Sequence, residues 1–526
     1  MVSDGNRNLR SPRRVFLATK IQFSTNLHQF QCGRDGHWEE GPKSPQSVSL
    51  QYRHPPVVSP CFAAPSLIQF GMLKRPTARQ SELEMVTLES LVPVDHLLRK
   101  IDAAIDFGFI RDLTEGLYCP DNGRPPIAPE ILFKALFIGY LFGIRSERQL
   151  MREIEVNVAY RWFLGLRLTD KVFDASTFSQ NRRRRFDGTD IAQNIFDRIV
   201  ELALKHGLVD GSVLYTDSTH LKASANKGRF DVEQVAKSRA DYWDALDAAV
   251  TVDRAAHDKK PLSSAPREPV IKENKVSRTD KDAGYMVRDG KPKGFFYLDH
   301  RTVDSKHNII TDTHTTAGNV HDSIPYLGRL DRQIERFDLD VKAVGLDAGY
   351  ANAPIAKGLE DRDILGVTGY LRPSGRKGML RKRQYEYDHG ADTYLCPEGQ
   401  ILTYATTDRQ GYRHYKSNPN KCRGCPLLAS CTTNPKAQKT ITRHVWADAR
   451  ERSDAHRLTD WGKRLYKRRK ETVERSFADA KQLFGHRYAR YRGITGVKWQ
   501  CLLAATAQNL RKLAKIFPAP QQTRKA

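Results

Sequence analysis

The sequence lacks any run of about 18 uncharged apolar residues, so it predicts no membrane-spanning helix and no membrane partner. Its N-terminal stretch MVSDGNRNLRSPRRVFLATKIQF is basic, but Lys20 interrupts the apolar part, which does not fit a secretory leader. Cysteine is scarce, with 8 in 526 residues at mixed spacings, and this excludes a secreted disulfide scaffold. We therefore expect a cytoplasmic protein.

Acidic residues are also too few to balance the basic ones. The chain has 61 Asp and Glu against 86 Lys and Arg, a formal net charge of +25. Such an excess favours a polyanionic partner, and nucleic acid is the first choice.

The residue patterns predict an α/β protein with an all-helical N-terminal domain. Residues 1–71 have no sustained period, and we expect them to be disordered or a wrongly assigned extension. The expected boundaries are a helical DNA-binding domain 72–207, a core 208–370 with a polar insertion 226–293, a second insertion 371–450, C-terminal core helices 451–515 and a tail 516–526. Within the polar insertion we expect one helix, over VEQVAKSRADYWDALDAAV (232–250), and a loop.

The helical part contains one strongly apolar segment and one strongly basic one. APEILFKALFIGYLFGI (128–144) is apolar nearly all round and predicts a central buried helix. In DASTFSQNRRRRF, either Asp174 or Ser176 is expected to cap a helix. The four arginines that follow, Arg182–Arg185, fit a solvated face and phosphate contact equally well.

Two aspartates follow short apolar runs. SVLYTDSTHLKASA reads as a buried strand with Asp217 at its end, and VKAVGLDAGYAN reads as a second strand with Asp347 at its end. An acid at a strand's end can project into a cleft, although Asp217 fits a turn-capping role equally well. From these residues alone, both a cleft-lining role and a turn-capping role stay open.

A third acid, Glu474, lies inside a predicted late helix, with Lys481 two turns later on the same face. Two aspartates and a glutamate are what a two-metal phosphoryl-transfer site requires, because hard divalent cations bind carboxylate oxygens. By spacing alone this signal is weak, since 61 acids allow many triplets.

The stretches YTDSTHLKA, GNVHDS, GLDAGYAN and ETVERSFADAKQLFGHRYARYRG resemble motifs of the DDE transposases of bacterial insertion sequences, over roughly residues 72–515. The resemblance is to the group with an InsH-like N-terminal domain. It implies an RNase H-like core that binds two Mg²⁺ ions, with Asp217, Asp347 and Glu474 as catalytic metal ligands. It also implies an endonuclease and strand transferase that acts as a homodimer on the paired ends of double-stranded DNA, in the bacterial nucleoid region of the cytoplasm.

The same resemblance suggests which basic residues contact DNA. They are expected to be Arg182, Arg183, Arg184, Arg185, Arg469, Lys470, Arg475 and Lys481. One departure concerns the arginine that the family places four residues before the glutamate. Lys470 occupies that position here, and Arg469 is the candidate substitute. His220, His321 and Asp322 lie in family-like blocks, and a hydrogen-bonded structural role is favoured for both histidines.

Four cysteines of the second insertion have metal-site spacing. Cys396, Cys422, Cys425 and Cys431 follow the pattern C-x25-C-x2-C-x5-C, which predicts a structural Zn²⁺ site in a zinc-ribbon-like segment. The alternative is a set of buried free thiols.

Two other functions use the same features. A non-catalytic DNA-binding protein derived from a transposase needs the basic charge but not the acids. A metal-dependent nuclease or phosphatase needs the acids but joins no strands. The resemblance favours the transposase.

Overall fold

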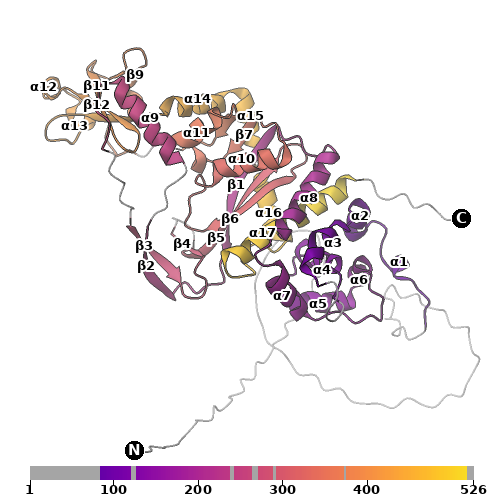
Figure 1. Ribbon diagram of the computed structural model, residues 1–526. Helices are drawn as coiled ribbons and strands as arrows, with labels where there is room; N and C mark the ends of the chain where they lie inside the picture. Colours follow the sequence, from indigo (N-terminus) through magenta and orange to yellow (C-terminus); the bar gives the residue numbers. More distant parts are fainter. Residues whose placement is uncertain are drawn as a thin grey trace, which may run out of the picture. The chain divides into compact units, whose positions relative to one another are not determined.

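The computed structural model describes residues 83–119, 126–236, 242–263, 271–287, 292–371 and 375–517. It is a mixed α/β structure with a helical N-terminal region (Figure 1). The expected extension 1–71 and nearly all of the tail 516–526 lie outside the described residues. No helix of the described ranges is both long and apolar enough to cross a bilayer.

Eight α-helices and two short helical turns precede the first strand. They are α1 (Leu88–Leu91), α2 (Leu97–Ala104), α3 (Phe109–Thr114), η1 (Glu115–Leu117), α4 (Pro129–Leu141), α5 (Glu147–Val156), α6 (Val158–Leu164), α7 (Ala175–Asn181), η2 (Arg182–Phe186) and α8 (Ile191–Lys205). The expected central helix is α4, which is buried along most of its length because it is apolar on every side. Asp174 caps α7 by accepting a hydrogen bond from the Ser176 N–H.

The last helix, α17 (Ile494–Ile516), joins the helical region to the sheet. The Trp499 ring lies 5.8 Å from Phe133 of α4 and 6.0 Å from Phe186. On the other side, the Asn509 amide accepts from the N–H of Ile310 (2.9 Å) and donates to its carbonyl (2.8 Å). The C-terminal helix therefore packs into the N-terminal helices and against the sheet at once.

The main sheet has eight strands, of which five form its centre. In spatial order these five are β6 (Ile310–Ala317), β5 (Gly294–Asp304), β1 (Val213–Lys222), β7 (Ala343–Leu346) and β8 (Leu365–Thr368). β5 is antiparallel to both β6 and β1, whereas β7 and β8 run parallel to β1. Every residue of β5 is buried, which is expected for a strand with elements on both faces. Helices α10 (Tyr326–Phe337) and α11 (Ala353–Glu360) connect β6 to β7 and β7 to β8.

The polar insertion 226–293 contains strands where a loop is expected. β2 (Phe230–Ala236) and β3 (Ile271–Ser277) pair with each other, and β4 (Gly284–Met286) joins them to β5, so the insertion extends the main sheet. The helix expected over residues 232–250 begins only at Tyr242, as α9 (Tyr242–Ala256), because residues 232–236 pair with β3 as part of β2.

The second insertion forms its own five-stranded sheet. Its strands are β9 (Glu386–Asp388), β10 (Thr393–Leu395), β11 (Ile401–Thr407), β12 (Tyr412–Ser417) and β13 (Thr440–His444), with short helices α12 (Pro419–Cys422) and α13 (Leu428–Cys431) between the last two.

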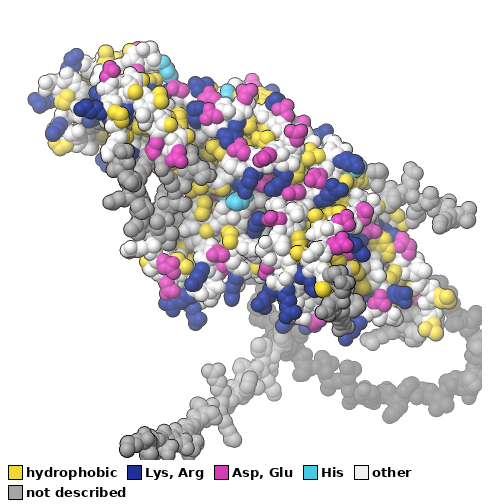
Figure 2. Space-filling model, viewed as in Figure 1, with side chains coloured by type: hydrophobic (Ala, Val, Ile, Leu, Met, Phe, Trp, Pro, Cys, Tyr) yellow, Lys and Arg dark blue, Asp and Glu magenta, His cyan; other side chains and the backbone are white. Residues whose placement is uncertain are grey.

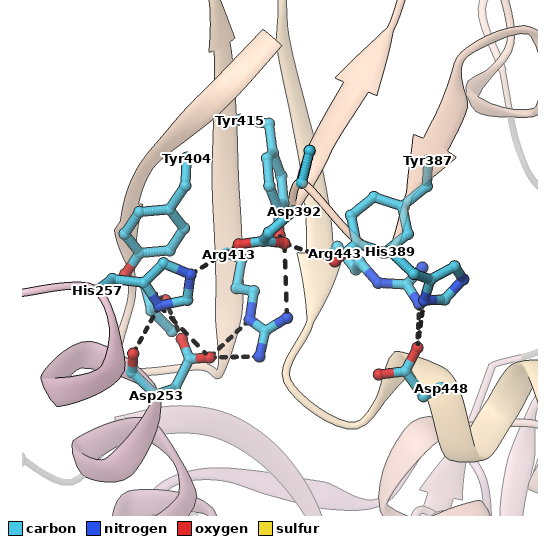
Figure 3. Close-up of polar contacts among 12 residues, drawn as sticks. Asp253, His257, Tyr387, His389, Asp392, Tyr404, Arg413, Tyr415, Arg443 and Asp448 are labelled. Atoms are coloured by element: carbon cyan, nitrogen blue, oxygen red, sulfur yellow. Dashed lines mark hydrogen bonds and ion pairs between the residues drawn. The ribbon is translucent and has the colours of Figure 1, made fainter.

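Helix α9 of the first insertion is joined to this sheet by polar contacts (Figure 3). The Arg413 Nε donates to Asp253 Oδ1 at 2.7 Å, and the His257 ring nitrogens lie 2.7 Å from the Asp253 carbonyl and 2.7 Å from an Asp392 carboxylate oxygen. The two insertions are therefore in direct contact although about 130 residues separate His257 from Asp392.

The predicted late helix is interrupted. The segment folds as α14 (Ala447–Leu458), α15 (Asp460–Arg468) and α16 (Val473–Leu483), with residues 469–472 between the last two. Thr472 has φ −107° and ψ −98°, outside the helical range. Glu474 consequently lies in the first turn of α16 rather than inside a continuous helix.

Candidate active site

The two strand aspartates lie side by side at the centre of the sheet. β1 and β7 pair in parallel from Val213–Ala343 to Thr216–Leu346, and Asp217 and Asp347 are the next residue on each strand. Contrary to expectation, β1 does not end at Asp217 but continues to Lys222 through its pairing with β5. The site therefore lies where the parallel pairing ends.

Asp217 is largely buried, with 20% of its side chain exposed, and its Oδ2 accepts from Arg469 Nη2 at 2.8 Å. Burial raises the pKa of Asp217 to about 6; Arg469 opposes this rise, and the charges of Asp347 and Asp322 add to it. Asp217 is therefore harder to ionise than a free aspartate, chiefly because it is buried, and Arg469 offsets this only in part.

Glu474 reaches the same arginine from α16. Its Oε1 lies 3.8 Å from Arg469 Nη1, and 45% of its side chain is exposed. The Arg469 side chain is only 4% exposed. One guanidinium thus lies between the acid of the first core strand and the acid of the late helix.

The arginine spacing that departs from the family pattern has a structural explanation. The Glu474 N–H donates to the Arg469 carbonyl at 3.1 Å, a bond that spans five residues instead of four. Such a wide turn absorbs one additional residue. Arg469 therefore points into the acidic group, whereas Lys470, at the family's position, is exposed.

Tyr466 borders the same site. Its hydroxyl accepts from Arg469 Nη1 at 3.4 Å. A Cβ added to Gly369, which follows β8, would lie 2.6 Å from that hydroxyl and 2.7 Å from the Ala348 nitrogen next to Asp347. A residue without a side chain is thus required for Tyr466 and the Asp347 turn to approach each other.

Asp322 is more closely involved than the sequence indicated. Its Oδ1 accepts from the Ser218 hydroxyl at 2.7 Å, directly beside Asp217. The motif GNVHDS was the available signal, although it gave Asp322 only a secondary role. The neighbouring His321 is exposed and bonds locally to Ser323 (2.8 Å), and His220 packs edge-on to Phe296 with ring centroids 6.0 Å apart. Both arrangements suit structural histidines.

A buried polar network attaches α16 to the sheet. Arg301, opposite Asp217 in the β1–β5 register, donates to Asp299 Oδ2 at 2.8 Å and lies 3.4 Å from the Ser476 hydroxyl of α16. His486, just after α16, lies 2.9 Å from the same Asp299 oxygen. Burial raises the pKa of Asp299, but Arg301 and His486 outweigh burial and lower it. This network positions the helix that carries Glu474.

The four arginines of η2 divide into two pairs. Arg182 forms an ion pair with Glu147 (2.7 Å), and Arg185 donates to Asn181 and lies 4.6 Å from the Tyr118 ring. Arg183 and Arg184 are exposed. Of the other basic residues predicted to contact DNA, Lys470 and Arg475 are exposed and Lys481 is half-buried, while Arg469 is engaged with Asp217.

The four cysteines line one small hollow in the second insertion. Cys396, Cys422, Cys425 and Cys431 face it together with Tyr385, whose hydroxyl lies 3.0 Å from the Cys431 sulfur. Among described residues, however, the ligand groups whose atoms all lie within 4.8 Å of one another are Asp299–His486–Cys501 and His389–Asp448–Glu451. The cysteine sulfurs are therefore close but more widely spread than a bound ion requires.

Neither of those two other groups forms a convincing ion site. Arg301 donates to Asp299, and Arg443 forms ion pairs with Asp448 and Glu451, the first of these at 2.5 Å (Figure 3). An arginine already supplies the positive charge in each group.

Two family descriptions match the chain. A "Transposase domain (DUF772)" matches residues 86–184, and a "Transposase DDE domain" matches residues 395–514. The first match includes three of the four η2 arginines, and the second includes Glu474 and the four cysteines. Asp217 and Asp347 lie outside both. No curated protein matches the chain.

Solved transposase structures show weak likeness. A piggyBac transposase synaptic complex with hairpin DNA is 11% identical, covers 82% of each chain and gives a TM-score of 0.26. A Mos1 transposase paired-end complex with the left transposon end is 12% identical, covers 47% of this chain and 61% of that chain, and gives a TM-score of 0.15. The family assignment rests on the two domain matches.

Proposed function

Since this chain is a DDE transposase of the insertion-sequence type, we propose that it cleaves DNA at the ends of its element and transfers the freed strands to a target. The observation that carries this proposal is that Asp217 and Glu474 both contact Arg469 while Asp347 lies beside Asp217 at the end of the neighbouring strand, although the three acids are far apart in sequence.

We also propose that the five central strands form an RNase H-like core. In support, three antiparallel strands, β6, β5 and β1, are followed by two parallel strands, β7 and β8. This order places Asp217 of β1 beside the end of β7, and α16 brings the glutamate to them. The fold thus accounts for why acids 130 and 127 residues apart meet.

The residues present fit a divalent-cation site. Asp217, Asp347 and Glu474 offer only hard oxygen donors, which suit such an ion. Among the described residues their carboxylates are not one of the ligand groups that lie within 4.8 Å of one another, and the Arg469 guanidinium lies between Asp217 and Glu474. Cation binding would therefore require Arg469 to withdraw and the three acids to move closer together. When bound, two divalent cations would stabilise the attacking and leaving oxygens of an in-line displacement at phosphorus. The Ser218 N–H donates to Asp217 Oδ1, and the Ser218 hydroxyl donates to Asp322, so Asp322 acts on Asp217 through Ser218.

Basic side chains of the protein would hold the DNA backbone. Exposed Lys470 and Arg475 flank Glu474, so they lie where the phosphates on either side of the cut bond would pass. The nucleophile is water or a DNA 3′-hydroxyl, and no protein nucleophile is needed. Because two element ends must be cut and joined together, we propose a homodimer on paired ends; sedimentation with and without end DNA checks this.

The test is a strand-transfer assay with the element's own end DNA and Mg²⁺, comparing wild type with Glu474→Gln. We expect the variant to lose at least about 100-fold in rate, because losing even an outer partner of a metal ligand costs 10–100-fold. Glu471→Gln is the matched control, since Glu471 is an exposed glutamate three residues away. Wild-type protein that binds the ends but never cuts them would instead indicate a non-catalytic DNA-binding protein.

We propose that the second insertion binds one structural Zn²⁺ through Cys396, Cys422, Cys425 and Cys431. Four thiolates facing one hollow suit a tetrahedral ion, which would draw the sulfurs together. Elemental analysis of purified protein should give about one zinc per chain, and Cys425→Ser should lose it while Cys119→Ser, at an exposed cysteine, keeps it. Wild-type protein with four reactive thiols and no zinc would contradict the proposal.

A further inference from the structure

Two large hollows of the helical region lie between α5 and the segment 485–493 that connects α16 to α17. Two adjoining cavities of about 1040 and 780 Å³ share Ile144, Arg145, Ser146 and Arg490. From the geometry of this groove we infer that it binds a single strand of DNA. The inference deepens the proposed function and rests on it for the origin of that strand.

The charge of the groove suits a phosphate backbone. The larger cavity is lined by six cationic residues: Arg145, Arg148, Arg152, Lys171, Arg182 and Arg490. Its three acids are Glu147, Glu155 and Asp174, of which Glu147 is paired with Arg182 and Asp174 caps α7. Within the described part of the chain, Arg148, Arg152 and Lys171 are exposed and form no ion pair, so their charge is available to a ligand.

Aromatic rings lie beside these basic side chains, and they offer stacking surfaces for the bases of a bound strand. Tyr488 and Phe142 line the smaller cavity and are 46% and 37% exposed. The guanidinium of Arg145 lies 5.3 Å from the Tyr488 ring centroid. Exposed rings with cations around them provide stacking surfaces for unpaired bases, which a duplex keeps stacked internally. This combination favours a single strand over a duplex.

The groove begins close to the candidate active site. The backbone of Tyr488 bridges to Lys222, the last residue of β1, which lies five residues beyond Asp217. Five strand residues span about 17 Å. At 3.4 Å per stacked nucleotide, a strand leaving the acids would reach Tyr488 after about five nucleotides. Figure 2 shows Lys and Arg side chains gathered on the surface around α5 and α7.

The test measures fluorescence anisotropy of a labelled dT12 strand and of a blunt 12-base-pair duplex. It uses full-length Asp217→Asn protein in buffer without Mg²⁺ and without chelator, so that cleavage plays no part and any structural zinc stays bound. Added to this background, Tyr488→Ala should weaken dT12 binding by about 5- to 150-fold, the range for losing one base–aromatic stack. Tyr488→Phe keeps the ring and should bind like its parent.

Charge is tested separately. Arg148→Gln should lower the slope of log K against log salt for dT12 by about 0.7, the value for one single-strand phosphate contact. Lys205→Gln, an equal charge loss at an exposed position of α8, should leave the slope unchanged. Unaltered dT12 affinity in Tyr488→Ala, or an equal loss of duplex and dT12 affinity in that variant, overturns the inference.

These outcomes separate the two proposals. Groove-dependent dT12 binding by a protein that never cuts element ends would keep this inference and refute the proposed function. Normal strand transfer by a protein whose groove variants all bind dT12 like their parent would do the reverse.

Discussion

Replacing Asp217 by asparagine should abolish strand transfer, with a loss of at least about 100-fold in rate at saturating Mg²⁺. Asparagine keeps the shape of the side chain but removes its negative charge. The variant therefore loses a carboxylate ligand and leaves Arg469, only 4% exposed, without its closest acid. The measurement is single-turnover cleavage of end DNA, followed by a joining assay with pre-cut ends.

The matched control is Asp340→Asn, at a residue that precedes β7 and whose side chain is 81% exposed. Its activity should equal that of wild type, because exposed substitutions away from special features change little. If Asp217→Asn cleaves as fast as Asp340→Asn, Asp217 is not part of the catalytic machinery.

Replacing Leu503 by alanine should lower the free energy of unfolding by about 2–5 kcal/mol. Leu503 is fully buried in α17, the helix that packs against both the N-terminal helices and β6. Because one helix serves both regions, we expect the helices and the sheet to become less stable together. Urea denaturation followed by far-UV circular dichroism and by tryptophan fluorescence measures both.

Leu458→Ala makes the same chemical change at a side chain that is 59% exposed. Its effect should stay within about 0.5 kcal/mol. A Leu503→Ala protein in which the two signals report separate transitions would show that the helical region and the sheet are independent units, contrary to this packing.

The sequence predicted the acids of the site better than their surroundings. Asp217 and Asp347 each follow a buried apolar run, and parallel pairing of those runs is enough to bring the aspartates together. The break at residues 469–472 was not predictable, because RKET contains no proline or glycine and suits a helix. It depends on Arg469 pairing with Asp217, about 250 residues away, and no local pattern records such a contact.

The structure of the first insertion also depends on contacts that a local sequence pattern cannot predict. FDVEQVA, the sequence of β2, has the composition of a helix as much as of a strand, and it becomes a strand by pairing with IKENKVS of β3. The helix predicted over residues 232–250 is right only in its second half, because residues 232–236 belong to β2 and α9 begins at Tyr242. The helix contacts the second insertion through His257 and Asp392. The sequence indicated two separate insertions into the core and gave no sign that they contact each other.

The central claim is that Asp217, Asp347 and Glu474 together bind divalent cations, and Mn²⁺ titration followed by electron paramagnetic resonance tests it most directly. Wild type and Asp340→Asn should bind Mn²⁺ alike, and both Asp217→Asn and Glu474→Gln should lose at least one site. If Glu474→Gln binds Mn²⁺ with the number of sites and the affinity of wild type, the glutamate of α16 does not share a cation with the strand aspartates, and the account is contradicted.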